Sequence, residues 1–344
     1  MELVVADGLG AERRAGFSIV DLGRVGPSKP RRAYQGFLRA VRYLVSARPS
    51  IVHFHDPELI PVGLVAKALG SQVIYDVHED VPRQILGRET MSKALRRFLA
   101  LGASVAEWIG ARVFNAIVCA TPKIAERFPG GKTVLVQNFP ILAELESAAP
   151  LPYAERQPWF IYMGVIAEMR GAREMAQAIE SLKPQRDAKL YVAGTFRSPS
   201  LEAELTSSDK YSATVFLGWA DRKQVARLLS NVRAGLVLFH EAPNHVDAQP
   251  NKLFEYMSVG LPVIASDFPL WRAVIDGAGC GLLVDPMDTT AIATAMDWIL
   301  DNPAEAEAMG RRGQMAVESR YNWKSEGEKL LELYQEILGA SSVK

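Results

Sequence analysis

The chain has 344 residues, of which 49% are hydrophobic, so it contains enough apolar material for two folded cores and too much for a disordered protein. Its 39 basic and 39 acidic residues cancel, so no overall charge favours nucleic acid, and attraction to a membrane has to be local. Cys119 and Cys280 lie in apolar runs and are interpreted as buried free thiols of a reducing compartment. No run approaches the roughly 18 apolar residues that a spanning helix needs, so we expect a cytoplasmic protein.

Short strand-like runs alternate with helix-period segments along the chain. In the first half they lie at 3–6, 17–20, 51–54, 73–75, 116–119 and 133–136, and in the second at 159–163, 189–193, 214–217, 235–239, 262–265 and 281–284. This alternation predicts parallel sheets whose ligand sites lie at the carboxyl ends of the strands. The Pro- and Ala-rich stretch 148–152 predicts two Rossmann-like domains, 1–150 and 151–322, followed by an amphipathic helix at 323–344.

The first half of the chain has two polar strand ends, and the first of them carries two histidines. His53 and His55 flank Phe54, and the strand period of two directs both side chains to one face. Two histidines on one face could form part of a zinc site, but no third ligand has suitable spacing, so we expect no metal here. Asp56 and the proline after it are explained by the start of a helix.

The second polar strand end reads Asp76-Val-His78-Glu79-Asp80. It is not a D-x-D metal motif, and no D-x-D occurs in the chain. His78 is a candidate functional residue, and a core histidine with a satisfied hydrogen bond is the structural alternative.

Glycines follow three strand-like runs of the second half. Gly164 ends the first run and is followed by Arg170, which can contact a phosphate in bidentate fashion or point into solvent. Gly194 and Gly218 end the next two runs. Glycine is common at such turns for backbone reasons alone, so each is a weak signal and only their order is informative.

The segment 247–267 is the most informative of the chain. Asp247 lies in a loop, Pro250-Asn251 opens a helix that contains Glu255, and a buried strand follows. A helix start binds phosphate well. Lys252 is unfavourable there against the helix dipole, which suits a bound anion, although a side chain that points to water is the alternative. A carboxylate one turn further can accept hydrogen bonds from a ribose diol. The segment therefore predicts a site for a nucleotide-diphosphate sugar, with an ordinary αβ unit bearing surface acids as the alternative.

With Asp247 and Glu255 at this separation, the segment resembles the E-x7-E region of retaining GT-B glycosyltransferases of family four, the glycosyl transferases group 1. Asp replaces the first Glu, and the sequence that follows resembles the bacterial surface-polysaccharide type. The resemblance implies an α/β GT-B fold with two Rossmann-like domains facing across a cleft. It implies a first domain that is N-terminally shortened, because the family's opening strand, glycine loop and helix have no counterpart before residues 3–6. The helix at 323–344 would return toward the first domain, although packing on its own domain is equally consistent with the sequence.

The resemblance also implies an activity of the hexosyltransferase type. A sugar would move from a nucleotide sugar to a glycan or lipid-linked acceptor with retention, without a metal or other cofactor, in cell-surface polysaccharide biosynthesis. His78 and Asp247 would be catalytic, and His55 and Glu79 would lie on the acceptor side. Val165 replaces the first of two basic residues that family members often carry here. The implied donor-binding residues are Gly164, Arg170, Gly194, Gly218, Asn251, Lys252, Leu253 and Glu255.

Two basic stretches, within 29–42 and 83–97, are further candidate contact regions. The second precedes apolar residues 98–101, so it suits anionic lipid headgroups, whereas a solvated helix face is the simpler interpretation. Contact with anionic lipid headgroups would place a cytoplasmic protein peripherally on the inner face of the cell membrane. Two other functions stay open: a nucleotide-sugar epimerase on the same fold, and a non-catalytic sugar-nucleotide-binding or assembly protein.

Overall fold

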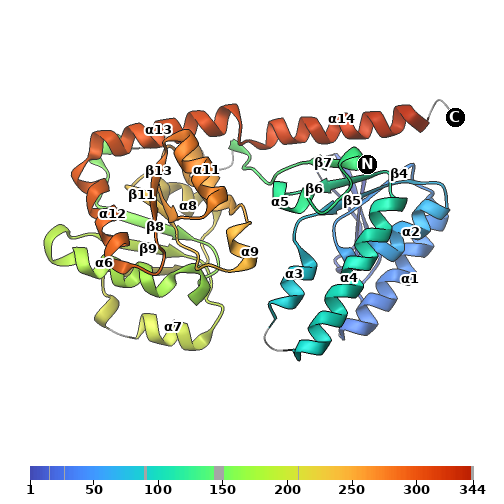
Figure 1. Cartoon of the computed structure of the whole chain (residues 1–344), viewed down its shortest axis with the longest axis horizontal. Coiled ribbons are helices and arrows are strands. Elements are labelled where there is room, and N and C mark those ends of the chain that lie inside the picture. Colours follow the sequence, from blue (N-terminus) through green and yellow to red (C-terminus); the bar gives the residue numbers. More distant parts are fainter. Residues whose placement is uncertain (15, 27, 89–90, 143–150, 208, 342–344) are drawn as a thin grey trace. The chain divides into compact units, whose positions relative to one another are not determined.

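The computed structural model describes residues 1–14, 16–26, 28–88, 91–142, 151–207 and 209–341. The chain forms two compact units, one of residues 1–137 with 329–344 and one of residues 138–328 (Figure 1). The predicted divide at 148–152 falls partly on 143–150, which lie outside the described residues, and the observed boundary precedes it. The C-terminal helix α14 (Trp323–Ser341) passes from the second unit into residues that belong to the first.

The second unit contains a six-stranded parallel sheet in the order β10-β9-β8-β11-β12-β13. Its strands are β8 (Trp159–Met163), β9 (Lys189–Ala193), β10 (Thr214–Gly218), β11 (Ala234–Val237), β12 (Val263–Ser266) and β13 (Gly281–Val284). From β8 the chain adds β9 and β10 toward one edge of the sheet, and from β11 it adds β12 and β13 toward the other edge. Ligands of doubly wound sheets bind at such a switch point, beyond the carboxyl ends of the strands.

Two apolar clusters form the core of the second unit. One contains buried residues of α6 (Ala172–Arg186), α7 (Pro199–Thr206) and α12 (Thr289–Asp301). The other contains residues of α8 (Arg222–Leu229), α10 (Asn251–Ser258), α11 (Pro269–Ala278) and α13 (Pro303–Ser319). The remaining elements are short: η4 (Tyr153–Glu155), η5 (Glu168–Arg170), η6 (Asp209–Tyr211) and α9 (Pro243–Val246). Because both faces of the sheet are covered, its strands are mostly apolar, as the sequence indicates.

The first unit contains two sheets. The parallel sheet β4-β5-β6-β7 consists of β4 (Ile51–Phe54), β5 (Gln72–Val77), β6 (Ala116–Cys119) and β7 (Thr133–Leu135). A separate sheet pairs β1 (Glu2–Val5) with β3 (Phe17–Asp21) in parallel, and β3 with β2 (Glu12–Arg14) in antiparallel orientation. Within the described residues, β1 and β4 each pair with a strand on one side only. The β2 strand was not predicted, because Glu12-Arg13-Arg14 carries no apolar signal.

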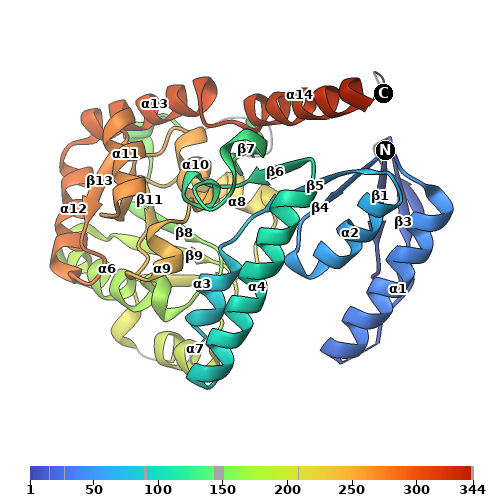
Figure 2. The same cartoon turned by 45° about the vertical axis from the view of Figure 1, so that its right-hand side comes forward.

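Three long helices line the first unit: α1 (Lys29–Ala47), α2 (Ile60–Ala68) and α4 (Lys93–Val113), of which α2 contacts both others (Figure 2). The shorter elements are η1 (Pro57–Leu59), α3 (Val81–Leu86), α5 (Pro122–Ala125) and η2 (Gly130–Lys132). Cys119 and Cys280 are buried free thiols, as predicted. No helix in the described part of the chain combines the length and the apolar character needed to cross a membrane.

Candidate functional site

The three predicted glycines meet at the carboxyl ends of neighbouring strands of the second unit. Gly164 follows β8, and its amide donates to the carbonyl of Ala193 at 2.8 Å. The Gly194 amide donates to the Gly218 carbonyl at 2.7 Å. Gly164 has a φ of 117°, and a side chain on Gly194 would clash with the Gly164 carbonyl at 1.8 Å. Only glycine permits this close approach of the strand ends.

Two basic side chains converge on Gly164. A Cβ at that position would lie 3.2 Å from Nζ of Lys252 and 3.8 Å from a terminal nitrogen of Arg170. Lys252 is 7% exposed, and its ammonium nitrogen has no hydrogen-bond partner in the structure. That nitrogen lies 3.8 Å from the centre of the Tyr162 ring and 5.2 Å from that of Phe239. Burial lowers the pKa of Lys252 well below its ordinary value, and the charge of Arg170 lowers it further.

The buried ammonium belongs to the first turn of α10. Pro250 precedes this helix and provides no side-chain cap. The Leu253 amide donates to the Pro250 carbonyl at 3.0 Å, and its side chain is buried in the core. Asn251, by contrast, is exposed. A positive helix end, a lysine and an arginine together form a site suited to a phosphate group.

Glu255 lies on α10 one turn after Asn251. Its side chain is 22% exposed, and one carboxylate oxygen lies 3.6 Å from a terminal nitrogen of Arg222. Asp247 is half-buried and ends α9, in the loop that leads to α10. The indole nitrogen of Trp271 donates to the Ala248 carbonyl at 2.7 Å, so the buried indole holds this loop in place.

Several residues of this site were missed by the sequence analysis. Tyr162 and Phe239 form the aromatic walls around Lys252, although their strand positions alone suggest only core packing. Glu174 on α6 and His240 after β11 form a buried pair, with Oε2 and Nε2 3.1 Å apart. This pairing was not predicted, because its members are far apart along the chain.

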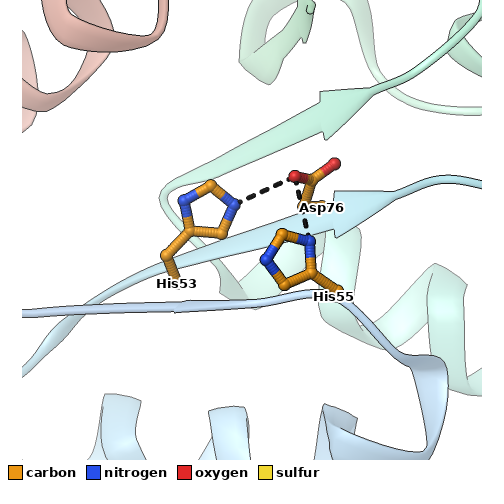
Figure 3. A group of neighbouring side chains, drawn as sticks. All are labelled: His53, His55 and Asp76. Carbon is orange, nitrogen blue, oxygen red and sulfur yellow. Dashed lines mark hydrogen bonds and ion pairs between the residues drawn. The ribbon is translucent and has the colours of Figure 1, made fainter. Parts of the chain in front are cut away.

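The histidine positions of the first unit also come together. The rings of His53 and His55 stack at 5.2 Å, which agrees with the predicted common face. His53 Nε2, His55 Nδ1 and His78 Nε2 lie 3.3, 3.2 and 3.4 Å from the same Asp76 carboxylate oxygen. Figure 3 shows the first two of these contacts. The sequence spacing offered no third partner for His53 and His55, but the pairing of β4 with β5 supplies Asp76.

This cluster changes the acidity of its members. Burial raises the pKa of Asp76, but the hydrogen bonds to the three imidazoles outweigh it and hold that pKa well below the ordinary range. The hydrogen bond to Asp76 raises the pKa of His78 in turn, although burial opposes the shift. Glu79 lies outside the cluster: its carboxylate accepts a hydrogen bond from Gln84 at 2.5 Å.

The predicted site residues thus form two groups. The second unit brings together the strand-end glycines, Arg170 and Lys252, with Asn251 and Glu255 on the same helix as Lys252. The first unit brings His55 and His78 together around Asp76.

Comparisons with known proteins agree with this architecture. The family model described as glycosyl transferases group 1 matches residues 143–315, which is half of the chain. Glycogen synthase of Mycobacterium tuberculosis is 25% identical over 305 residues, covering 84% of this chain and 69% of that protein.

Solved structures share the fold. Sucrose-phosphate synthase of Thermosynechococcus elongatus superposes with a TM-score of 0.76 at 18% identity, covering 98% of this chain and 89% of that one. HepE of Anabaena in complex with UDP-glucose gives a TM-score of 0.69 at 12% identity, covering 98% of this chain and 100% of that one. The two Rossmann-like units are those of the GT-B architecture, and the chain belongs to the glycosyl transferases group 1 family.

Proposed function

We propose that this glycosyltransferase moves a sugar from a nucleotide-diphosphate sugar to an acceptor hydroxyl, with retention and without a metal ion at the donor. One observation carries the proposal: the ammonium of Lys252 is buried and unpartnered beside Arg170, at the switch point of the second sheet. Buried charges are normally paired, so the arrangement calls for an anion. A diphosphate supplies that anion, and the names of the relatives and neighbours support a sugar nucleotide as its source.

Each donor residue then has a distinct role. Lys252 and Arg170 neutralise the charge that develops on the leaving diphosphate, aided by the start of α10 near Asn251. Gly164 lets a phosphate approach the backbone, and by resemblance to the family Gly194 borders the phosphates and Gly218 the nucleobase. Glu255 accepts hydrogen bonds from the ribose hydroxyls. By resemblance to the family, Asp247 binds a hydroxyl of the donor sugar, and His78 also serves the donor sugar.

Retention follows from attack on the face that the leaving group departs from. The bond between the anomeric carbon and the phosphate oxygen breaks, and the acceptor oxygen bonds to the same face of that carbon. The proton of the acceptor hydroxyl passes to the departing phosphate oxygen, so no enzyme nucleophile is required. This mechanism is carried over from the family.

The acceptor proposal rests on one face of α4. Phe98, Leu101, Val105 and Trp108 recur at helical spacing, and Phe98 and Trp108 are 73% and 56% exposed. The Arg112 guanidinium lies 3.5 Å from the centre of the Trp108 ring. Exposed apolar side chains with arginines beside them suit a membrane surface that carries anionic lipids. We therefore propose a lipid-linked or glycan acceptor of cell-surface polysaccharide synthesis, met by a cytoplasmic enzyme at the inner face of the membrane.

Replacing Lys252 by Met should separate stability from ligand binding. The change removes a buried, unpaired cation, so the free energy of unfolding should rise by about 1–3 kcal/mol. The same change should weaken UDP binding at least about tenfold, because the phosphate loses its buried partner. Chemical denaturation and calorimetry measure the two effects. Lys189→Met, at the amino end of β9, is the matched control and should leave UDP affinity unchanged. A loss of both stability and affinity would contradict the assignment.

The pH dependence of UDP affinity should report the same lysine. The pKa of Lys252 is lowered in the free protein, and a bound phosphate favours the ammonium form. Binding therefore takes up a proton once the pH exceeds that lowered pKa. UDP affinity should fall as the pH rises above that lowered pKa, and this fall should be absent in Lys252→Met, which corrects for ionisation of the ligand itself. Parallel profiles for the two proteins would exclude this linkage.

Glu255→Ala should weaken nucleotide binding at least about tenfold, or about 1.4 kcal/mol, because the ribose loses a charged acceptor. Inorganic pyrophosphate lacks the ribose, so its affinity should stay the same in this variant and should fall in Lys252→Met. Calorimetry with both ligands gives the comparison. If UDP and pyrophosphate lose equal affinity in Glu255→Ala, the residue supports the fold and does not bind ribose.

Donor binding should not require Mg²⁺ or Mn²⁺, because cationic side chains take the place of the metal. UDP affinity should be the same in excess EDTA and in the presence of either ion. Affinity that is lost in EDTA and restored by Mg²⁺ or Mn²⁺ would refute metal-independent binding at this site.

The α4 face should bind vesicles that contain phosphatidylglycerol. Changing Phe98 and Trp108 to Glu removes apolar area and adds repulsion, so binding should weaken at least about tenfold in cosedimentation. Met315→Glu is a control on the second unit, where the side chain is 59% exposed. Equal loss in both proteins would show a general charge effect and no docking face.

A further inference from the structure

His53, His55 and Asp76 each offer one atom to a common point at the ends of β4 and β5. These three ligand atoms all lie within 4.8 Å of one another. The Asp76 carboxylate oxygen lies 3.3 Å from His53 Nε2 and 3.2 Å from His55 Nδ1. Two ligands at 2.0–2.1 Å from a tetrahedral Zn²⁺ are separated by roughly 3.3 Å, so both separations suit a shared ion.

Hydrogen bonds alone satisfy the polar atoms of this cluster poorly. The single Asp76 oxygen faces three imidazole nitrogens but has two lone pairs. His55 Nδ1 also lies 2.8 Å from His78 Nε2. Nδ1 bears either one proton or one lone pair, so it cannot serve the carboxylate and His78 equally well. A cation lets the nitrogens and the carboxylate oxygen all direct lone pairs at one ion at the same time.

We propose that His53, His55 and Asp76 bind a divalent zinc-type ion in the first unit. Two imidazoles and one carboxylate are the ligand chemistry of Zn²⁺, whereas Mg²⁺ and Ca²⁺ prefer all-oxygen sites. His78 Nε2 lies beside the three ligands, 2.8 Å from His55 Nδ1 and 3.4 Å from the Asp76 oxygen. The role of the ion is to hold the ends of β4 and β5 together.

The surroundings of the three ligands support an ion. His53 Nδ1 lies 2.6 Å from the hydroxyl of Tyr334 on α14, within hydrogen-bond distance. Ligating histidines generally donate their second N–H to such a partner, which fixes the tautomer and turns Nε2 toward the metal. The side chains of His53 and Asp76 are 13% and 11% exposed, whereas His55 is 60% exposed and provides a path from solvent.

The test uses the full, tag-free chain after removal of metals with a chelator. Titration with Zn²⁺ in a calorimeter should show one tight site, and Co²⁺ at the same site should give the visible absorption of tetrahedral coordination. His55→Ala should weaken Zn²⁺ binding more than about a hundredfold, and Tyr334→Phe about tenfold, because it removes only the outer partner. Mg²⁺ should give no binding heat at this site.

Two controls keep the result decisive. His55 is largely exposed, so its removal leaves no cavity, and circular dichroism verifies the fold of the variant. His245→Ala removes a histidine of the second unit and should leave Zn²⁺ affinity unchanged. Absence of a saturable site in the wild-type chain, or equal Zn²⁺ affinity in His55→Ala and wild type, would overturn the proposal.

Discussion

The buried ammonium of Lys252 is the constraint on which the proposed donor site of this protein depends. A desolvated cation packed on the faces of Tyr162 and Phe239, next to the guanidinium of Arg170, raises the free energy of the ligand-free fold. The cation–π contact with Tyr162 compensates only part of that cost. In the proposed donor complex an anion removes the remainder, so energy stored in the fold becomes affinity for the diphosphate. In the proposed reaction the same charges stabilise the diphosphate as its bond to the sugar breaks.

The rest of the second unit keeps that cation in position. The β8, β9 and β10 strands end in glycines whose backbones are close enough that a side chain on Gly194 would clash. Met163 donates its amide to the Tyr256 hydroxyl at 3.0 Å, which ties β8 to the helix that carries Lys252. A side chain on Gly235 would meet the ring of Tyr256 at 2.2 Å, so α10 packs against β11 without a spacer. The charged group is therefore fixed by the core.

Local patterns made much of this predictable from the sequence. The 251–258 helix was recognisable because Pro250 suits its start and Gly260, with a φ of 69°, follows its end. Strands buried on both faces gave apolar runs that located most of the two parallel sheets. The aromatic walls around Lys252 were not predictable, because Tyr162 and Phe239 look like any core residue of a strand. The Asp76 cluster was not predicted because β4 and β5 are adjacent only in the folded sheet. The β2 strand was not predicted because its residues are all charged.

A crystal structure of the chain with bound UDP is the decisive measurement for the proposed donor site. We expect a phosphate oxygen within hydrogen-bond distance of both Lys252 Nζ and the Arg170 guanidinium, with the ribose hydroxyls on the Glu255 carboxylate. A nucleotide bound elsewhere, with the Lys252 ammonium still buried against Tyr162 and without an anionic partner, would contradict the proposed site.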